Sequence, residues 1–194
     1  MKAAATTADR ILGEARSLIM ARGYNGFSYA DIAAVVGVSK ANVHHHFAGK
    51  SDLATAVVEQ SRAGIQAQVH ALREMEPNAA EQLRAYTRYW ERCILDDSAP
   101  FCIAAMLAAE LPSLPHDVAV AVRAFFVDLR GWLTDILVLG LRQGGVTLVG
   151  TPEEEADAFL SAVYGAMLSA RAFGDPRRFA VIVETLLSRV VPFR

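Results

Sequence analysis

Hydrophobic residues recur at every third or fourth position along most of the chain, which is the spacing of an amphipathic helix. The first such segment spans residues 7–22, and its apolar stripe consists of Ala8, Ile11, Leu12, Ala15, Leu18 and Ile19. No segment combines β-branched alternation with the turn residues of a hairpin. The most strand-like stretch, GGVTLVG at residues 144–150, is short and flanked by glycines, and we predict a loop there. The pattern predicts an all-α protein.

Capping residues and prolines divide this pattern into about nine helices. Gly23 ends the first helix, and Ser28, Ser39 and Ser51 are the predicted N-caps of the next three. Later boundaries coincide with prolines. The predicted helices span residues 7–22, 29–36, 40–47, from the Ser51 cap to just before Pro77, 79–95, 101–111, 116–143, 152–172 and 176–190.

Composition favours a globular protein with a sizeable core. The chain has 194 residues, of which 53% are hydrophobic, and no apolar run approaches the ~18 residues that a membrane span needs. The formal net charge is −2, but residues 1–50 carry six basic and three acidic side chains. This mildly basic part is compatible with nucleic-acid binding. There is no apolar signal-peptide core, and two cysteines do not make a disulfide scaffold. We therefore expect a cytoplasmic protein.

The segment AAVVGVSKA joins two short predicted helices through a turn that contains a glycine. A positive φ at that glycine lets the helices cross steeply, as in a helix-turn-helix. The second helix of such a unit enters the DNA major groove, so we expect DNA contacts from Ser39, Lys40, Ala41, Asn42, His44 and His45. Val43 and Phe47 are predicted to point inward. Lys50 and the helix N-termini at Ser28 and Ser51 are placed to hold phosphates.

Three short motifs connect this unit to its flanks: GYNGFSYADIA at residues 23–33, GVSK at 37–40 and HHFAGKSDL at 45–53. Their combination resembles the DNA-binding domain of the TetR family of one-component repressors, over residues 11–57. The resemblance implies an N-terminal three-helix helix-turn-helix domain, residues 1–50. It also implies a C-terminal helical domain for ligand binding and dimerisation, residues 51–194. Such a dimer binds palindromic double-stranded operator DNA and is released by a small-molecule inducer.

The run of His44, His45 and His46 also invites a metal-site interpretation. Neighbouring residues are about 100° apart around a helix axis, so three in a row cannot chelate one ion, and we expect no metal. We expect His44 and His45 to face DNA and His46 to pack partly against the first helix. The TetR family often has tyrosine where this chain has His44, and an imidazole can donate a similar hydrogen bond with some sensitivity to pH.

A second candidate site lies in DDSAPFCIAAMLAAELPSLP, residues 96–115. Pro100 is predicted to start a helix with Cys102 in its first turn, where the helix dipole makes a thiol a better nucleophile. The stretch resembles the NemR-like and AcuR-like subgroup of the TetR family, which responds to electrophiles and small unsaturated acids. This resemblance implies that Cys102 senses such a compound, with Arg171 close to it. The alternative is an inert Cys102 in the core and a non-covalent inducer. Cys93 is predicted to be structural.

The helical body also offers side chains for an effector pocket. Such pockets are mostly apolar with a few polar groups. We expect Trp90, Phe101 and Trp132 to line it, although each has plain core packing as its alternative. Arg130 and Arg171 are the candidate partners for a carboxylate ligand.

The last two predicted helices carry more apolar side chains than one helix pair needs to bury. They are Phe159, Leu160, Val163, Tyr164, Met167, Leu168, Phe179, Ile182, Val183, Leu186, Leu187 and Val190. A homodimer through these two helices would bury them. It would also space two recognition helices by about one DNA turn, ~34 Å.

A helical enzyme is the rival class of protein. The sequence holds no Ser/His/Asp order, no H-E-x-x-H and no glycine-rich phosphate loop. The acidic run EEE at residues 153–155 opens a helix and is interpreted as solvated. We therefore expect no enzymatic activity, no cofactor and no membrane partner.

Overall fold

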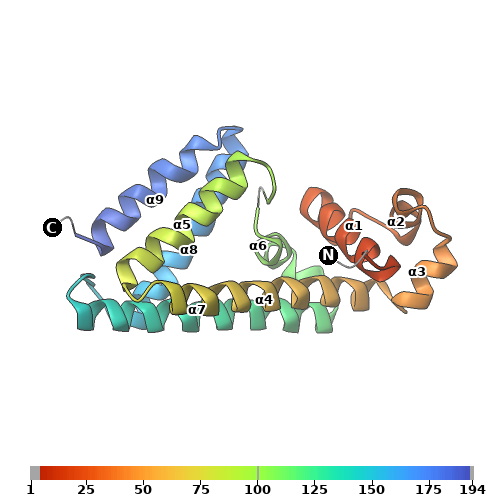
Figure 1. The fold of residues 1–194 in the computed structure, drawn as a ribbon. Helices are drawn as coiled ribbons and strands as arrows, with labels where there is room; N and C mark the ends of the chain where they lie inside the picture. The colour runs from red at the N-terminus through yellow and green to blue at the C-terminus, as the bar shows by residue number, and fades with distance from the viewer. Residues whose placement is uncertain (1–4, 100, 193–194) are drawn as a thin grey trace. The chain divides into compact units, whose positions relative to one another are not determined.

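The computed structural model describes residues 5–99 and 101–192, and within them it contains nine α-helices, one short 3-10 helix and no strand (Figure 1). The predicted all-α fold is therefore confirmed. No helix in these residues is long and apolar enough to cross a membrane. The elements are α1 (Thr7–Arg22), α2 (Tyr29–Val36), α3 (Lys40–His46), α4 (Lys50–Met75), α5 (Ala79–Leu95), α6 (Ile103–Ala108), η1 (Leu111–Ser113), α7 (His116–Gln143), α8 (Pro152–Phe173) and α9 (Arg177–Val190).

Helix boundaries follow local capping signals closely. α1, α2, α5 and α7 begin and end at the predicted residues, and residues 144–150 form a loop. Besides α6, described below, two helix starts differ from the prediction. α4 begins at Lys50, because Asp52 rather than Ser51 provides the cap: its carboxylate accepts from the Gly49 amide at 2.8 Å. α9 begins one residue later than predicted, with Pro176 as its N-cap residue.

The predicted helix over residues 101–111 is shorter in the structure. α6 has only six residues, and η1 follows it after a break. Pro112 lies in η1, where its missing N–H prevents a longer regular helix. Pro100, which we expected to start this helix, lies outside the described residues. Cys102 directly precedes α6 and is not part of its first turn.

The chain forms two compact units, each built from two segments: residues 1–65 with 103–126, and residues 66–102 with 127–194. In the first unit α1 packs on α2 and on α6, and α2 packs on α3. Fully buried apolar side chains there include Ile11, Ile19, Ile32, Val43, Leu53 and Val57. The functional boundary at residue 50 stays a prediction.

The second unit is centred on α8, which packs along α9, while α5 also contacts α9 (Figure 1). Its fully buried side chains include Leu83, Leu133, Ile136, Leu137, Phe159, Met167 and Phe179. Many of the apolar residues that we assigned to a dimer interface therefore belong to this core. They are Phe159, Leu160, Val163, Met167, Phe179, Val183, Leu187 and Val190.

Two polar pairs join the C-terminal part of α4 to α7 within the second unit. Gln66 Nε2 donates to Asp128 Oδ2 at 2.6 Å, and Arg73 Nη2 donates to Asp135 Oδ2 at 2.7 Å. The partners of both pairs are 62 residues apart in the sequence, so the two helices run parallel here (Figure 1). The buried residues of α4 all lie near its other end: Leu53, Ala54, Val57 and Val58.

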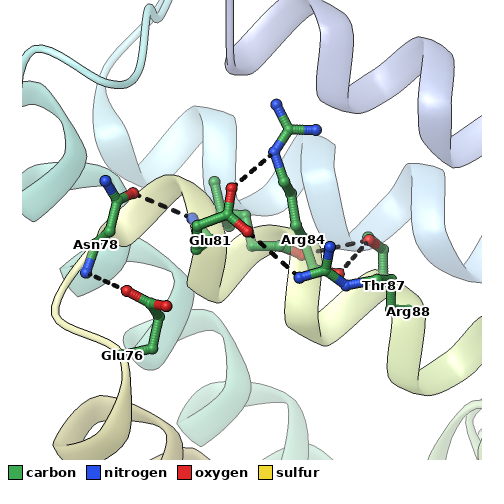
Figure 2. A network of polar contacts seen from close by, with 7 residues as sticks. Glu76, Asn78, Glu81, Arg84, Thr87 and Arg88 are labelled. Carbon is green, nitrogen blue, oxygen red and sulfur yellow. Dashed lines mark hydrogen bonds and ion pairs between the residues drawn. The ribbon is translucent and has the colours of Figure 1, made fainter.

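Polar contacts fix the start and the outer face of α5, as Figure 2 shows. Asn78 is the N-cap. Its side-chain oxygen accepts from the backbone amide of Glu81 at 3.2 Å, and the backbone amide of Asn78 donates to Glu76 Oε1 at 2.9 Å. Glu81 then forms ion pairs with Arg84 at 3.3 Å and Arg88 at 3.4 Å. These contacts orient the helix that carries part of the candidate effector site.

Leu133 and Val127 both lie on α7, but Leu133 is fully buried (0% exposed) and Val127 is exposed (68%). We expect Leu133→Ala to lower the free energy of unfolding by about 2–5 kcal/mol, because it removes apolar burial and leaves a cavity. Val127→Ala should change it by less than about 0.5 kcal/mol. Denaturant unfolding followed by circular dichroism measures both, and equal effects would contradict this packing.

Candidate nucleic-acid interface and effector site

α2, a tight turn and α3 form the predicted helix-turn-helix. Gly37 has a φ of 74° and a ψ of 39°, a left-handed conformation that favours glycine. The amides of Gly37 and Val38 both donate to the Ala33 carbonyl, at 3.0 and 3.1 Å. The turn thus ends α2 and redirects the chain before Ser39, whose hydroxyl caps α3 by accepting from the Asn42 amide at 3.1 Å.

α3 presents one apolar side to the core and a polar side to solvent. Val43 is fully buried and Phe47 is half-buried, as the inward-facing prediction requires. The predicted DNA-contacting side chains of this helix are all exposed: Lys40, Ala41, Asn42, His44 and His45. The structure therefore gathers them on the outside of one short helix.

His44 is held in place by α2. Its ring lies edge-on to Tyr29, with 4.6 Å between the centroids, and its Nδ1 lies 3.2 Å from the Ala48 carbonyl oxygen. A neutral ring that donates from Nδ1 to this carbonyl has Nε2 as an acceptor, so donation to a phosphate needs the protonated ring. His46, which we expected to pack partly against α1, is exposed, and its ring contacts that of His45.

Two of the three positions predicted to hold phosphates, Ser28 and Lys50, are engaged within the first unit. Ser28 forms a capping box with Asp31, and its side-chain and backbone hydrogen bonds lower the pKa of that carboxyl group. Lys50 donates to the Phe27 carbonyl and lies over the rings of Tyr24 and Phe27. Burial lowers the pKa of Lys50. Phosphate contacts from Ser28 and Lys50 stay predictions.

Sequence reasoning missed two contacts that hold the helix-turn-helix in place. Arg10 of α1 donates to the Val36 carbonyl at the end of α2, and Glu110 accepts from the Tyr24 amide at 3.1 Å. The partners are 26 and 86 residues apart in the sequence. No local periodicity or capping pattern indicates pairs at such separations.

The effector candidates gather around Tyr86 in the second unit. Its ring contacts those of Trp132 and Phe159, with centroid distances of 5.2 and 6.5 Å, and Trp90 and Cys102 are also neighbours. Cys102 Sγ donates to Tyr164 Oη at 3.9 Å. We call Tyr86, Trp90, Cys102, Trp132 and Tyr164 the Tyr86 cluster. The sequence pointed to three of its members, whereas Tyr86 and Tyr164 were two large side chains among many.

Several polar atoms of the Tyr86 cluster are buried without a hydrogen bond. Tyr86 Oη, Trp90 Nε1 and Trp132 Nε1 have no partner in hydrogen-bonding geometry among residues 5–99 and 101–192. Trp90 and Tyr164 nevertheless lie close enough to Tyr86 to interact with its hydroxyl group as hydrogen-bond partners, although with poorer geometry. Burial raises the pKa of both Tyr86 and Tyr164, so their hydroxyl groups stay protonated. The cluster therefore offers several donors to a bound molecule.

The basic residues predicted for this site lie at its margin or away from it. Arg130 is exposed, and its Nε donates to Asp157 Oδ1 at 2.6 Å, so it is an ion-pair partner on the surface and not part of the Tyr86 cluster. Arg171 is exposed and lies over the Phe101 ring, 5.5 Å from its centroid. Phe101 itself is buried directly before Cys102.

Trp132 links the Tyr86 cluster to a surface groove. This groove of about 410 Å³ lies between α4 and α7 and is lined by Gln66, Asp128, Gly131 and Trp132 among others. Trp132 is almost fully buried and contacts Tyr86.

A helix-turn-helix with an exposed polar second helix, followed by a larger helical unit, is the architecture of a transcriptional regulator. Residues 11–57 match the family model of bacterial regulatory proteins of the tetR family. A TetR-family transcriptional regulator from Agrobacterium tumefaciens is 48% identical in sequence; its crystal structure superposes with a TM-score of 0.93, over 95% of this chain and 97% of that one. The chain belongs to the TetR family and is a transcriptional regulator.

More distant relatives include the transcriptional repressor NemR from Escherichia coli strain K12. NemR is 23% identical over 167 residues, which cover 85% of this chain and 84% of NemR. The structure of E. coli NemR in its reduced form has a TM-score of 0.84 at 21% identity, and the match covers 97% of this chain and 100% of that one. The expected resemblance to NemR is therefore confirmed.

The two thiols are expected to be slow to react in the folded protein, because Cys102 and Cys93 are only 2% and 8% exposed. We expect the disulfide reagent 5,5′-dithiobis(2-nitrobenzoate) to label them at least about tenfold more slowly in buffer than in denaturant, since labelling requires local opening. A Cys93→Ser variant isolates the rate at Cys102. Rapid stoichiometric labelling of the folded variant would show an accessible thiol.

Proposed function

We propose that this protein is a ligand-responsive repressor that binds palindromic operator DNA as a homodimer through residues 39–50 and is released by a small molecule bound at the Tyr86 cluster. The observation that carries the ligand part is the set of buried polar groups on Tyr86, Trp90 and Trp132, none of which has a well-formed hydrogen bond. Buried polar groups in native proteins are nearly always paired. A bound effector would pair them.

The polar side of α3 supports binding in the major groove. Lys40 can donate to guanine edges or phosphates, and Asn42 can pair with the edge of adenine. Both are exposed at the N-terminal end of the helix, which is the end that contacts base edges in helix-turn-helix proteins. His44 and His45 follow one turn later and complete the surface.

The outer face of α8 supports a homodimer. Exposed residues at helical spacing along it are mostly small: Ala158, Ser161, Gly165, Leu168 and Ala172. Small side chains let two helices approach closely, and Leu168 at 59% exposure, with Val181 of α9 at 64%, offers apolar area to cover. We propose that a second copy of the chain covers this face of α8 and α9, in a two-fold arrangement.

The structure favours a non-covalent effector over a thiol-reactive one. Cys102 is almost fully buried, which disfavours its thiolate form and limits the access of an electrophile. The donors of the Tyr86 cluster instead suit a small molecule with acceptor oxygen atoms, such as a carbonyl compound. Thiol sensing by Cys102 is the second candidate, supported by the resemblance to NemR.

Operator binding gives the direct test. If Lys40 contacts a phosphate, Lys40→Ala should weaken binding and reduce the slope of log affinity against log salt by about one. Arg88→Ala, which removes a charge from α5 in the second unit, is the matched control and should leave the slope unchanged. Genomic DNA fragments captured by the protein would supply the operator, and the slope is measured by fluorescence anisotropy. The absence of sequence-preferring binding at every salt concentration would overturn the repressor proposal.

The two tryptophans of the chain, Trp90 and Trp132, both belong to the Tyr86 cluster, so intrinsic fluorescence reports on it. N-ethylmaleimide and N-ethylsuccinimide carry the same two carbonyl groups, but only the maleimide alkylates thiols. We expect both to change the fluorescence and lower operator affinity, and Cys102→Ser to keep both responses. A response confined to the maleimide and lost in Cys102→Ser would establish thiol sensing instead.

A further inference from the structure

Glu110 fastens the segment after α6 to the C-terminal end of α1. Its Oε1 accepts from the Tyr24 amide at 3.1 Å, and its Oε2 accepts from Asn25 Nδ2 at 3.5 Å. Asn25 Nδ2 also lies 3.4 Å from Ser113 Oγ, which in turn donates to the Glu110 carbonyl at 3.0 Å. We call these four residues the Glu110 clasp.

Gly23 makes room for this clasp. A Cβ atom at Gly23 would lie 1.9 Å from Glu110 Oε1, which is far inside van der Waals contact. Gly23 also has a φ of 73°, in the region that favours glycine. The glycine that ends α1 therefore allows the Glu110 carboxylate to approach, in addition to forming the turn itself.

The Glu110 clasp also acts on the first residue of α4. Lys50 lies over the ring of Tyr24, 4.7 Å from its centroid, and donates to the Phe27 carbonyl. Burial lowers the pKa of Lys50, and the negative charge of Glu110 opposes that shift. The Glu110 carboxylate thus hydrogen-bonds to Tyr24 and Asn25 in the loop after α1 and interacts electrostatically with Lys50 at the start of α4.

We propose that Glu110 is a positioning residue that couples the effector site to the helix-turn-helix. Cys102 of the Tyr86 cluster is followed directly by α6, and α6 packs on α1. After α6, Glu110 accepts a hydrogen bond from the Tyr24 amide at the end of α1. α1 in turn packs on α2, and its Arg10 donates to the Val36 carbonyl at the end of α2. In this proposal a displacement at Cys102 passes along the chain into α6, and Glu110 carries it to the helix-turn-helix. The inference rests on the proposed function for its two end points.

A double-mutant cycle on operator affinity tests the coupling in the full-length chain. Cys102→Met places a longer side chain directly before α6 and imitates a displacement at the effector site. We expect it to weaken operator binding by about tenfold in the wild-type background and by less than about twofold in Glu110→Ala. Glu110→Gln keeps an acceptor for the Tyr24 amide but loses the charge. In that background the loss of operator affinity caused by Cys102→Met should lie between the losses in the wild-type and Glu110→Ala backgrounds.

Glu14→Ala is the matched control, because it removes the same charge from α1 and should keep the tenfold effect. Thermal unfolding checks that each variant folds; where Cys102→Met does not, Ile103→Val in α6 provides a milder displacement. The coupling is overturned if the displacement has the same effect with and without Glu110, or has no effect on operator affinity at all.

Amide hydrogen exchange at Tyr24 needs no DNA and separates the two proposals. Glu110→Ala should speed exchange of this amide by at least about tenfold, because the carboxylate that accepts its hydrogen bond is gone, whereas Glu14→Ala should not. If the wild-type protein binds no operator, the proposed function fails while the clasp is still tested. An unchanged Tyr24 exchange rate in Glu110→Ala would overturn the clasp itself.

Discussion

The hydrogen bond from the Tyr29 hydroxyl to the Phe47 carbonyl, 2.9 Å long, is the contact on which the candidate DNA-binding surface depends. α3 has only seven residues, and a helix this short is unstable on its own in water. Tyr29 satisfies the carbonyl directly after the helix and packs its ring against His44. Burial raises the pKa of Tyr29 to about 12, so its hydroxyl remains a donor at physiological pH. With Val43 buried beneath, the outer side chains of α3 gain a rigid base.

In α3 a hydrogen bond satisfies the C-terminal end of the helix, whereas the Tyr86 cluster of the second unit holds buried polar groups without well-formed hydrogen bonds. A buried donor that lacks a partner costs about 1–3 kcal/mol, and Trp132 Nε1 is such a donor in this cluster. Proteins retain such groups where function requires them. A molecule that accepts a hydrogen bond from this donor would recover that free energy on binding, so a feature that lowers the stability of the fold would also favour the proposed ligand.

Local signals in the sequence were sufficient for most of the fold. α1 and α2 were predicted to the residue, because Gly23 and Gly37 end them and Ser28 caps α2. α6 was misjudged because a continuous apolar run between prolines does not reveal whether the chain is helical or merely buried.

The candidate sites divide in the same way. The side chains of α3 follow from a local motif, and the sequence named them. The Tyr86 cluster draws residues from α5, α7 and α8, and the Arg130–Asp157 ion pair joins α7 to α8. Neither leaves a trace in periodicity or spacing, because each depends on how helices distant in the sequence pack together.

The equal sequence separation of the two pairs between α4 and α7 constrains how these helices can move past each other. A slide of α4 by one helical turn, about 5.4 Å, would take Gln66 away from Asp128 and Arg73 away from Asp135 in a single step. Both contacts are then made together or lost together.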